Sequence, residues 1–229
     1  RSKHRRSPGR PVLAAPGSRS EDLLYTIPAV LIAISMHEFA HGYVSYKLGD
    51  PTPKQSGRLS LNPFRHLDLV GTLCLMFFHF GWAKPVMVNP YYYKKRKKGM
   101  LLVALGGPIM NFFIAFMSLL TMGLMIKVTG GFITSSLVMV AFNLLQYMVI
   151  INLGLGVFNL IPVPPLDGSK VLGAVLPEDK YFKYMQYERY GSLILILLLV
   201  IGVISGPLSF VTNLLHNGMV DIVSLILRI

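Results

Sequence analysis

Long apolar stretches separated by short polar links dominate the chain. Residues 100–126 and 128–166 contain no charged side chain. Because roughly 20 apolar residues suffice for a helix to cross the hydrocarbon core of a bilayer, both stretches are long enough to span it. The pattern predicts an all-α polytopic membrane protein with about 4–6 transmembrane helices.

Helix breakers and polar links mark where the expected helices begin and end. Residues 29–41 lack Gly and Pro, which favours a helix through the first apolar stretch. Three prolines in PVPPLDG, residues 162–168, interrupt the apolar pattern and predict a break. The expected helices cover residues 23–48, 100–127 and 134–160 and a stretch from about residue 191, with a separate short or surface-lying helix at 207–229.

A different pattern occupies residues 69–90. Residues 69–83 are uncharged but too few for a straight helical crossing. The segment that follows, WAKPVMVNP, alternates around two prolines and favours extended structure. We therefore expect a short re-entrant or β-hairpin element near residues 69–90, packed on protein or beside a watery cavity, because irregular backbone is not tolerated against lipid.

Two regions complete the domain organisation. Residues 1–22 are rich in Arg, Ser, Pro and Gly and favour a disordered leader or a segment foreign to the native protein. Residues 23–229 are expected to form a single membrane-embedded domain, with a core at residues 25–175 and C-terminal helices at residues 190–229.

Composition agrees with a membrane protein and argues against nucleic-acid binding. Hydrophobic residues make up 53% of the 229 residues and charged residues only 14%, and the mean hydropathy is +0.56. Half of the 22 basic residues, the source of the +12 net charge, lie in the first 19 positions and at residues 94–98. Such clusters beside apolar spans are typical of the anionic membrane surface. With a single cysteine, Cys74, the chain has no intramolecular disulfide.

HEFAH, residues 37–41, places three ionisable groups at the end of the first apolar stretch. Such groups are costly inside a bilayer and indicate a functional site. On a helix, His37 and His41 lie about 40° apart around the axis and one turn along, so both imidazoles can bind one ion. Glu38 points about 100° away, which suits it to exchange protons with a metal-activated water. The pattern indicates a zinc metalloprotease.

A third zinc ligand is needed, because catalytic zinc sites usually have three protein ligands and one open position. Asp167 is preferred, since an acid at a proline break after a long uncharged stretch is costly unless it is paired or binds a cation. A helix N-cap is its structural alternative. His79, within the expected re-entrant element, is the main competitor; His66 and His216 favour loop or interfacial roles, and His4 lies in the excluded leader.

Two asparagines in apolar surroundings are further candidates for the site. Asn111 could donate to the developing oxyanion or fix the attacking water, and Asn159 could bind an extended substrate backbone. Ordinary hydrogen bonding between helices is the alternative for both, because an amide in lipid needs partners.

These motifs together resemble the site-2 protease family of intramembrane zinc metalloproteases. HEFAH resembles the family's His-Glu-x-x-His, NLIPVPPLDG its Asn-x-x-Pro-x-Pro-x-Leu-Asp-Gly, GGPIMN its small-Gly-Pro-x-x-Asn motif, and WAKPV its membrane-embedded hairpin region. The resemblance covers residues 25–175 and is strongest to small bacterial members that lack PDZ and CBS domains. Pro165 is an added proline that leaves the ligand in register, whereas the missing accessory domain leaves the mode of substrate selection open.

The resemblance implies a role for each motif residue. His37, His41 and Asp167 would bind one zinc ion per chain, with Glu38 as the catalytic acid/base. Asn111 would lie near the metal site, and Asn159 would belong to the same motif as Asp167.

The implied function is hydrolysis of a peptide bond within or next to a transmembrane segment of a membrane protein substrate, in regulated intramembrane proteolysis. The protein would be a multi-pass protein of a bacterial cell membrane, with the lipid bilayer and a transmembrane substrate as partners and no nucleic acid. Oligomeric state and substrate identity stay open. One alternative is a non-catalytic polytopic protein that binds a metal or a partner. A membrane di-iron lipid oxidase is disfavoured, since six histidines are too few.

Overall fold

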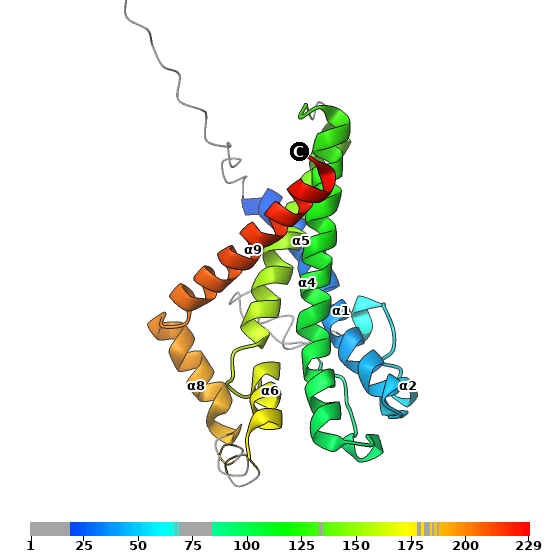
Figure 1. Ribbon diagram of the computed structural model, residues 1–229, viewed down its shortest axis with the longest axis vertical. Coiled ribbons are helices and arrows are strands. Elements are labelled where there is room, and N and C mark those ends of the chain that lie inside the picture. The colour runs from blue at the N-terminus through cyan, green and yellow to red at the C-terminus, as the bar shows by residue number, and fades with distance from the viewer. Residues whose placement is uncertain are drawn as a thin grey trace, which may run out of the picture.

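The computed structural model shows a bundle of long helices (Figure 1). It describes residues 19–66, 68, 84–132, 135–177, 180, 184, 186 and 188–229. The expected re-entrant or hairpin element at residues 69–90 lies mostly outside these ranges. Its described part, residues 84–89, is extended and pairs with no other described segment as a strand.

Within the described residues, four helices are long and apolar enough to cross a membrane. They are α1 (Arg19–Lys47), α4 (Arg96–Thr129), α5 (Ser136–Asn159) and α9 (Ser205–Leu227). The shorter elements are α2 (Thr52–Gln55), η1 (Pro63–Arg65), η2 (Pro90–Tyr92), α6 (Asp167–Val175) and α8 (Glu188–Ile201). The prediction of an all-α polytopic membrane protein is confirmed.

Helix α4 runs through the middle of the bundle and packs on α1, α5, α6 and α9 (Figure 1). Its face toward α5 and α9 forms an apolar core. This core comprises Ala115, Leu119, Val149, Leu153, Val223 and Leu227. Small residues let the helices approach closely: a Cβ on Gly106 would lie 3.3 Å from the Ala40 carbonyl oxygen of α1, as is common between membrane helices.

The C-terminal apolar stretch divides into two helices as expected, but the break lies at Gly202 and not at Pro207. Helix α8 ends before Gly202, whose φ of +77° favours glycine. Helix α9 then has 23 residues, the same number as the expected range 207–229, and is long and apolar enough to cross a membrane. Its last turn is held against α4 because Lys127 Nζ donates to the Leu227 carbonyl at 2.5 Å.

A buried carboxylate organises the polar link after α1. Asp50 is fully buried and accepts hydrogen bonds from Ser45 Oγ at 2.7 Å, the Thr52 amide at 2.9 Å and the Asn89 amide at 2.7 Å. Ser45 Oγ also lies 2.6 Å from the Tyr93 hydroxyl. Burial alone would raise the pKa of Asp50, but the hydrogen bonds from Thr52, Asn89 and Ser45 outweigh it and lower that pKa. Asp50 thereby ties residues 84–93 to the end of α1.

We expect Asp50→Asn to lower the free energy of unfolding by about 1–3 kcal/mol at pH 7, because one amide group cannot accept all three bonds. Since the folded-state pKa is lowered, the contribution of Asp50 is complete above its unfolded pKa of about 3.9 and is lost as the pH falls through the folded value. Thermal unfolding at neutral and acidic pH should show the difference between wild type and variant shrinking below about pH 4. The exposed Asp221→Asn is the control; equal effects of both changes would contradict the prediction.

Candidate metal centre

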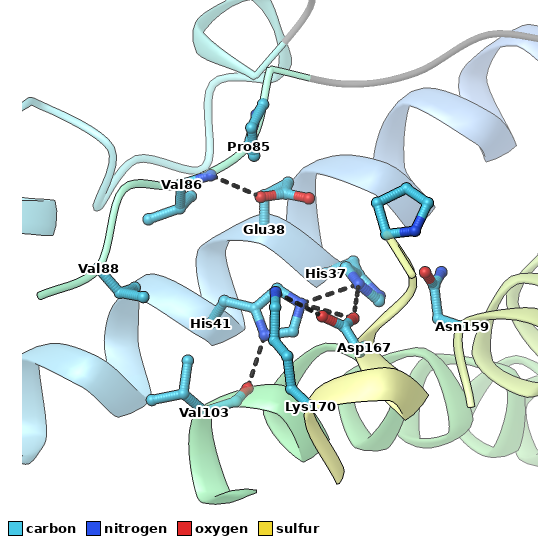
Figure 2. A pocket seen from close by; sticks show the side chains of 11 residues that line it. His37, Glu38, His41, Pro85, Val86, Val88, Val103, Asn159, Asp167 and Lys170 are labelled. Carbon is cyan, nitrogen blue, oxygen red and sulfur yellow. Dashed lines mark hydrogen bonds and ion pairs between the residues drawn. The ribbon is translucent and has the colours of Figure 1, made fainter. Parts of the chain in front are cut away.

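Three side chains from two distant parts of the chain meet in one buried cluster (Figure 2). His37 and His41 project from one face of α1, and Asp167 is the first residue of α6. Each histidine Nε2 lies 3.0 Å from Asp167 Oδ2, and the two Nε2 atoms lie 3.0 Å apart. All three residues are buried. The structure thus brings together the three side chains for which the sequence suggests metal binding.

The outer nitrogens of both imidazoles are held by acceptors. His37 Nδ1 lies 2.5 Å from Asn111 Oδ1, and His41 Nδ1 lies 2.6 Å from the carbonyl oxygen of Val103. Because a backbone carbonyl can only accept, His41 carries its proton on Nδ1. The same tautomer of His37 points a second Nε2 lone pair at the carboxylate. Three electron-rich atoms then face one another away from bulk water, an arrangement that favours a cation between them.

Zinc fits this donor set. Three points 3.0 Å apart lie about 1.7 Å from their common centre, so the three atoms leave room for an ion with bonds of about 2.0–2.1 Å. Two neutral imidazoles and one carboxylate are ordinary zinc ligands, and hydrogen bonds at the outer ring nitrogens are typical of zinc-binding histidines. In the described part of the chain, His37, His41 and Asp167 form the group with metal-binding geometry.

Glu38 lines the same pocket without joining the cluster (Figure 2). Its Oε2 accepts a hydrogen bond of 2.9 Å from the Val86 amide, in the extended segment 84–89. The pocket has a volume of about 140 Å³, enough for several waters at roughly 30 Å³ each or for one peptide group. Pro85, Val86 and Val88 form its wall opposite α6. The Glu38 carboxylate thus lies beside the cluster, and its other oxygen, Oε1, takes no part in the bond to Val86.

Asp167 owes its position to the proline break between α5 and α6. Leu166 takes the N-cap position and Asp167 opens the helix, so the capping alternative does not describe its role. One turn further, Lys170 Nζ lies 3.4 Å from Asp167 Oδ1, while Oδ2 faces the histidines. The Lys170 ammonium beside Oδ1 favours the ionised form of Asp167. A carboxylate anion is a suitable metal ligand.

The two other histidines that the structure describes lie away from the cluster. His66 is buried and its Nε2 donates to the Ser60 carbonyl at 2.7 Å, the loop role that the sequence suggests. His216 is half-buried on α9 beside Asn217. The competing ligand, His79, and the leader residue His4 lie outside the described residues.

The two candidate asparagines occupy different positions. Asn159 lines the pocket, and its Nδ2 donates to the Leu155 carbonyl at 3.0 Å. Asn111 is fully buried behind His37, and its amide donates to the Ala33 carbonyl and to Asn152. Oxyanion support by Asn111 would therefore require one of these bonds to break.

Sequence reasoning missed several contributors to the site. Asn152 has no sequence signal beyond that of any amide in an apolar helix, although its oxygen accepts from Asn111 at 2.8 Å. Gly107 belongs to the GGPIMN motif without a role of its own there, yet a Cβ at this position would lie 2.5 Å from the His37 ring. Lys170 carries a sequence signal, since a basic residue three positions after an acid shares its helix face. The Val86 amide has no such sequence signal, because every residue except proline has a backbone amide.

Comparisons with known proteins agree with this site. The family model described as "Peptidase family M50" matches residues 117–202 of this chain. YwhC of Bacillus subtilis (strain 168), whose name provisionally classes it as a zinc metalloprotease, is 37% identical over 183 residues, 77% of this chain and 80% of that protein. Rip2 of Mycobacterium tuberculosis (strain ATCC 25618 / H37Rv), named in the same way, is 24% identical over 77% of this chain and 66% of its own length. Zinc metalloprotease MJ0392 of Methanocaldococcus jannaschii is 25% identical, and the chain covers 42% of it. No solved structure gives a significant match.

A membrane bundle that carries a His/His/Asp centre beside a glutamate is the arrangement of an integral-membrane zinc metalloprotease. The similarity to YwhC extends over most of both chains and indicates a common ancestor. The chain belongs to peptidase family M50, the site-2 protease family, and is a zinc metalloprotease. The expected family, enzyme class and zinc requirement are confirmed.

Proposed function

We propose that this protein hydrolyses a peptide bond within or next to a transmembrane segment of a membrane protein, as a step of regulated intramembrane proteolysis in a bacterial cell membrane. His37, His41 and Asp167 bind one zinc ion, and Glu38 is the general base and acid. The proposal extends the confirmed zinc metalloprotease assignment to a particular kind of substrate and to particular residues.

The observation that carries the proposal is the convergence of two imidazoles and a carboxylate within 3.0 Å, between helices long enough to span a bilayer. A polar cluster in such surroundings is costly unless it has a function. Its location supports a substrate that also lies in the membrane, because a soluble peptide would have to enter a bundle whose outer faces are apolar.

Each residue has a separate task at this site. When bound, zinc supplies Lewis-acid activation of a water and of the scissile carbonyl. Glu38 takes the proton released by the attacking water and passes it to the leaving amine, using the carboxylate oxygen that does not contact Val86. Lys170 neutralises Asp167 Oδ1, which leaves Oδ2 for the metal. Asn159, at the pocket wall, retains an amide hydrogen and an oxygen for the substrate backbone.

The extended segment 84–89 is suited to holding an unwound substrate. The amides of Lys84, Val86 and Asn89 are engaged inward, by the His66 carbonyl, Glu38 and Asp50 respectively. Within the described part of the chain, no hydrogen bond occupies the carbonyl groups of residues 84–88. A substrate strand could therefore add along this edge, with its scissile bond beside Glu38. Helical substrates must unwind locally before this, because a helix uses its own carbonyls.

Zinc binding by three variants tests the ligand set. We expect His37→Ala and Asp167→Ala each to weaken zinc binding by more than the roughly 10–100-fold that loss of a supporting group costs. Competition against a chromophoric chelator, with purified protein in detergent, gives the affinities. His216→Ala, at a histidine distant from the pocket, should bind zinc like wild type. Full zinc affinity in Asp167→Ala would show that the third ligand is another residue, with His79 the next candidate.

A cleavage assay separates the proposed enzyme from a non-catalytic metal-binding protein. The probe is a single transmembrane helix with a tag at each end, reconstituted with the protease in lipid vesicles. Zinc-dependent cleavage inside or next to the helix is the expected result. Cleavage confined to the soluble tags would contradict intramembrane substrate specificity while leaving the metalloprotease assignment intact.

A further inference from the structure

Four hydrogen bonds made by Asn152 and Asn111 connect α5 to the metal-binding face of α1. Asn152 Nδ2 donates to the Met148 carbonyl at 2.8 Å, and Asn152 Oδ1 accepts from Asn111 Nδ2 at 2.8 Å. Asn111 Nδ2 also donates to the Ala33 carbonyl at 3.2 Å, and its Oδ1 faces His37 Nδ1 at 2.5 Å. Both asparagines are fully buried, so water cannot replace any of these partners.

The direction of every bond in this chain is determined by backbone carbonyls. A carbonyl oxygen only accepts, so Asn152 must turn its amino group toward Met148 and its oxygen toward Asn111. Asn111 must likewise turn its amino group toward Ala33, which leaves its oxygen for His37. An oxygen at that position accepts only from a protonated Nδ1. The arrangement therefore leaves the His37 Nε2 with a lone pair directed at the metal position.

Helix α4 supplies the rest of this support from one stripe of its surface. Val103, Gly107 and Asn111 are four residues apart and share a face. The Val103 carbonyl accepts from His41 Nδ1, Asn111 accepts from His37, and the missing Cβ of Gly107 leaves room for both rings. The two histidines are thus oriented by the neighbouring helix rather than by α1 itself.

We propose that Asn152 is a positioning residue of the metal centre, which acts through Asn111 to set the tautomer and ring orientation of His37. The inference rests on the proposed zinc ligation by His37. It assigns Asn111 to support of the metal ligand instead of to the oxyanion. It also assigns a role to Asn152, which contacts neither the ligand set nor the pocket.

Two substitutions of Asn152 test this assignment. Leu removes the acceptor for Asn111 at similar volume, whereas Asp retains an oxygen acceptor in either protonation state. We expect Asn152→Leu to weaken zinc binding by about 10–100-fold and Asn152→Asp to stay within about threefold of wild type. Cobalt in place of zinc provides a second readout, because the intensity of its visible absorption bands depends on ligand geometry. Asn152→Leu should alter that spectrum and Asn152→Asp should preserve it.

Asn143→Leu is the matched control, because Asn143 lies two and a half turns earlier on α5 and does not line the pocket. It should leave zinc affinity and the cobalt spectrum unchanged. Thermal unfolding of the metal-free proteins shows whether any variant loses general stability. Equal zinc affinity in wild type and Asn152→Leu would overturn the inference, and so would a loss in Asn152→Asp as large as in Asn152→Leu.

A second pair keeps the test decisive if Asn152→Leu does not fold. Asn111→Asp retains an acceptor for His37, whereas Asn111→Leu removes both the acceptor and the donors. The inference predicts zinc binding at least about tenfold tighter in Asn111→Asp than in Asn111→Leu; equal affinities would overturn it. If wild-type protein itself bound no zinc, the proposed ligand set would fail first, which distinguishes the two failures.

Discussion

Replacing Glu38 with glutamine is expected to abolish measurable peptide cleavage while zinc stays bound. General acid–base catalysis contributes about 10²–10⁴-fold to the rate, and an amide can neither take the proton of the attacking water nor return it to the leaving amine. Glutamine has nearly the same shape, and its oxygen can still accept from the Val86 amide. The local structure should therefore persist. Initial rates on the tagged transmembrane helix, together with zinc content, give both quantities.

Asp22→Asn is the matched control for this experiment, since it makes the same acid-to-amide change at the other end of α1. Asp22 accepts from the Tyr147 hydroxyl at 2.6 Å, and an asparagine oxygen can keep that bond. This variant should cleave like wild type. Cleavage by Glu38→Gln within a few-fold of wild type would remove Glu38 from the chemistry, and loss of zinc in Glu38→Gln would show that it belongs to the ligand set instead.

The parts of the fold and site that the sequence predicts are those with a local signal. Uncharged stretches identify α4 and α5 because burial in lipid excludes charge over a whole helix. The spacing of His37 and His41 predicts their shared face because helix geometry is regular. Asp167 is predicted as a ligand because an ionised acid beside a proline break is energetically costly in a membrane without a partner. The structure places this carboxylate against both imidazoles.

The parts that the sequence does not predict depend on contacts between helices. Asn143 and Asn152 are the same residue type on the same apolar helix, and only the arrangement of α4 against α5 shows that Asn152 contacts Asn111. Helix α9 begins two residues before the expected start at Pro207, because proline is tolerated in the first turn of a helix. The bond from the Val86 amide to Glu38 depends on tertiary placement of an extended segment and has no residue-type signal.

Gly107→Ala is expected to disable the metal centre although it adds a single methyl group. A Cβ at this position would lie 2.5 Å from His37 Nε2 and 2.6 Å from His41 Nε2, distances that real Cβ atoms essentially never adopt. The rings have little freedom to move, because Asn111 and Val103 hold their outer nitrogens. We expect zinc affinity to fall by at least about 10–100-fold, as for loss of a supporting group, and cleavage to fall with it.

Global stability should change much less than metal binding in this variant. Overpacking costs about 1–3 kcal/mol, but alanine regains about 1 kcal/mol of helix propensity over glycine. Gly154→Ala on α5 is the control, since a Cβ there meets nothing within 4 Å, and it should bind zinc and cleave like wild type. Normal zinc affinity in Gly107→Ala would mean that the two imidazoles can shift together without losing the ion. The close packing of α4 on α1 would then support the bundle, and α4 would not determine the geometry of the zinc ligands.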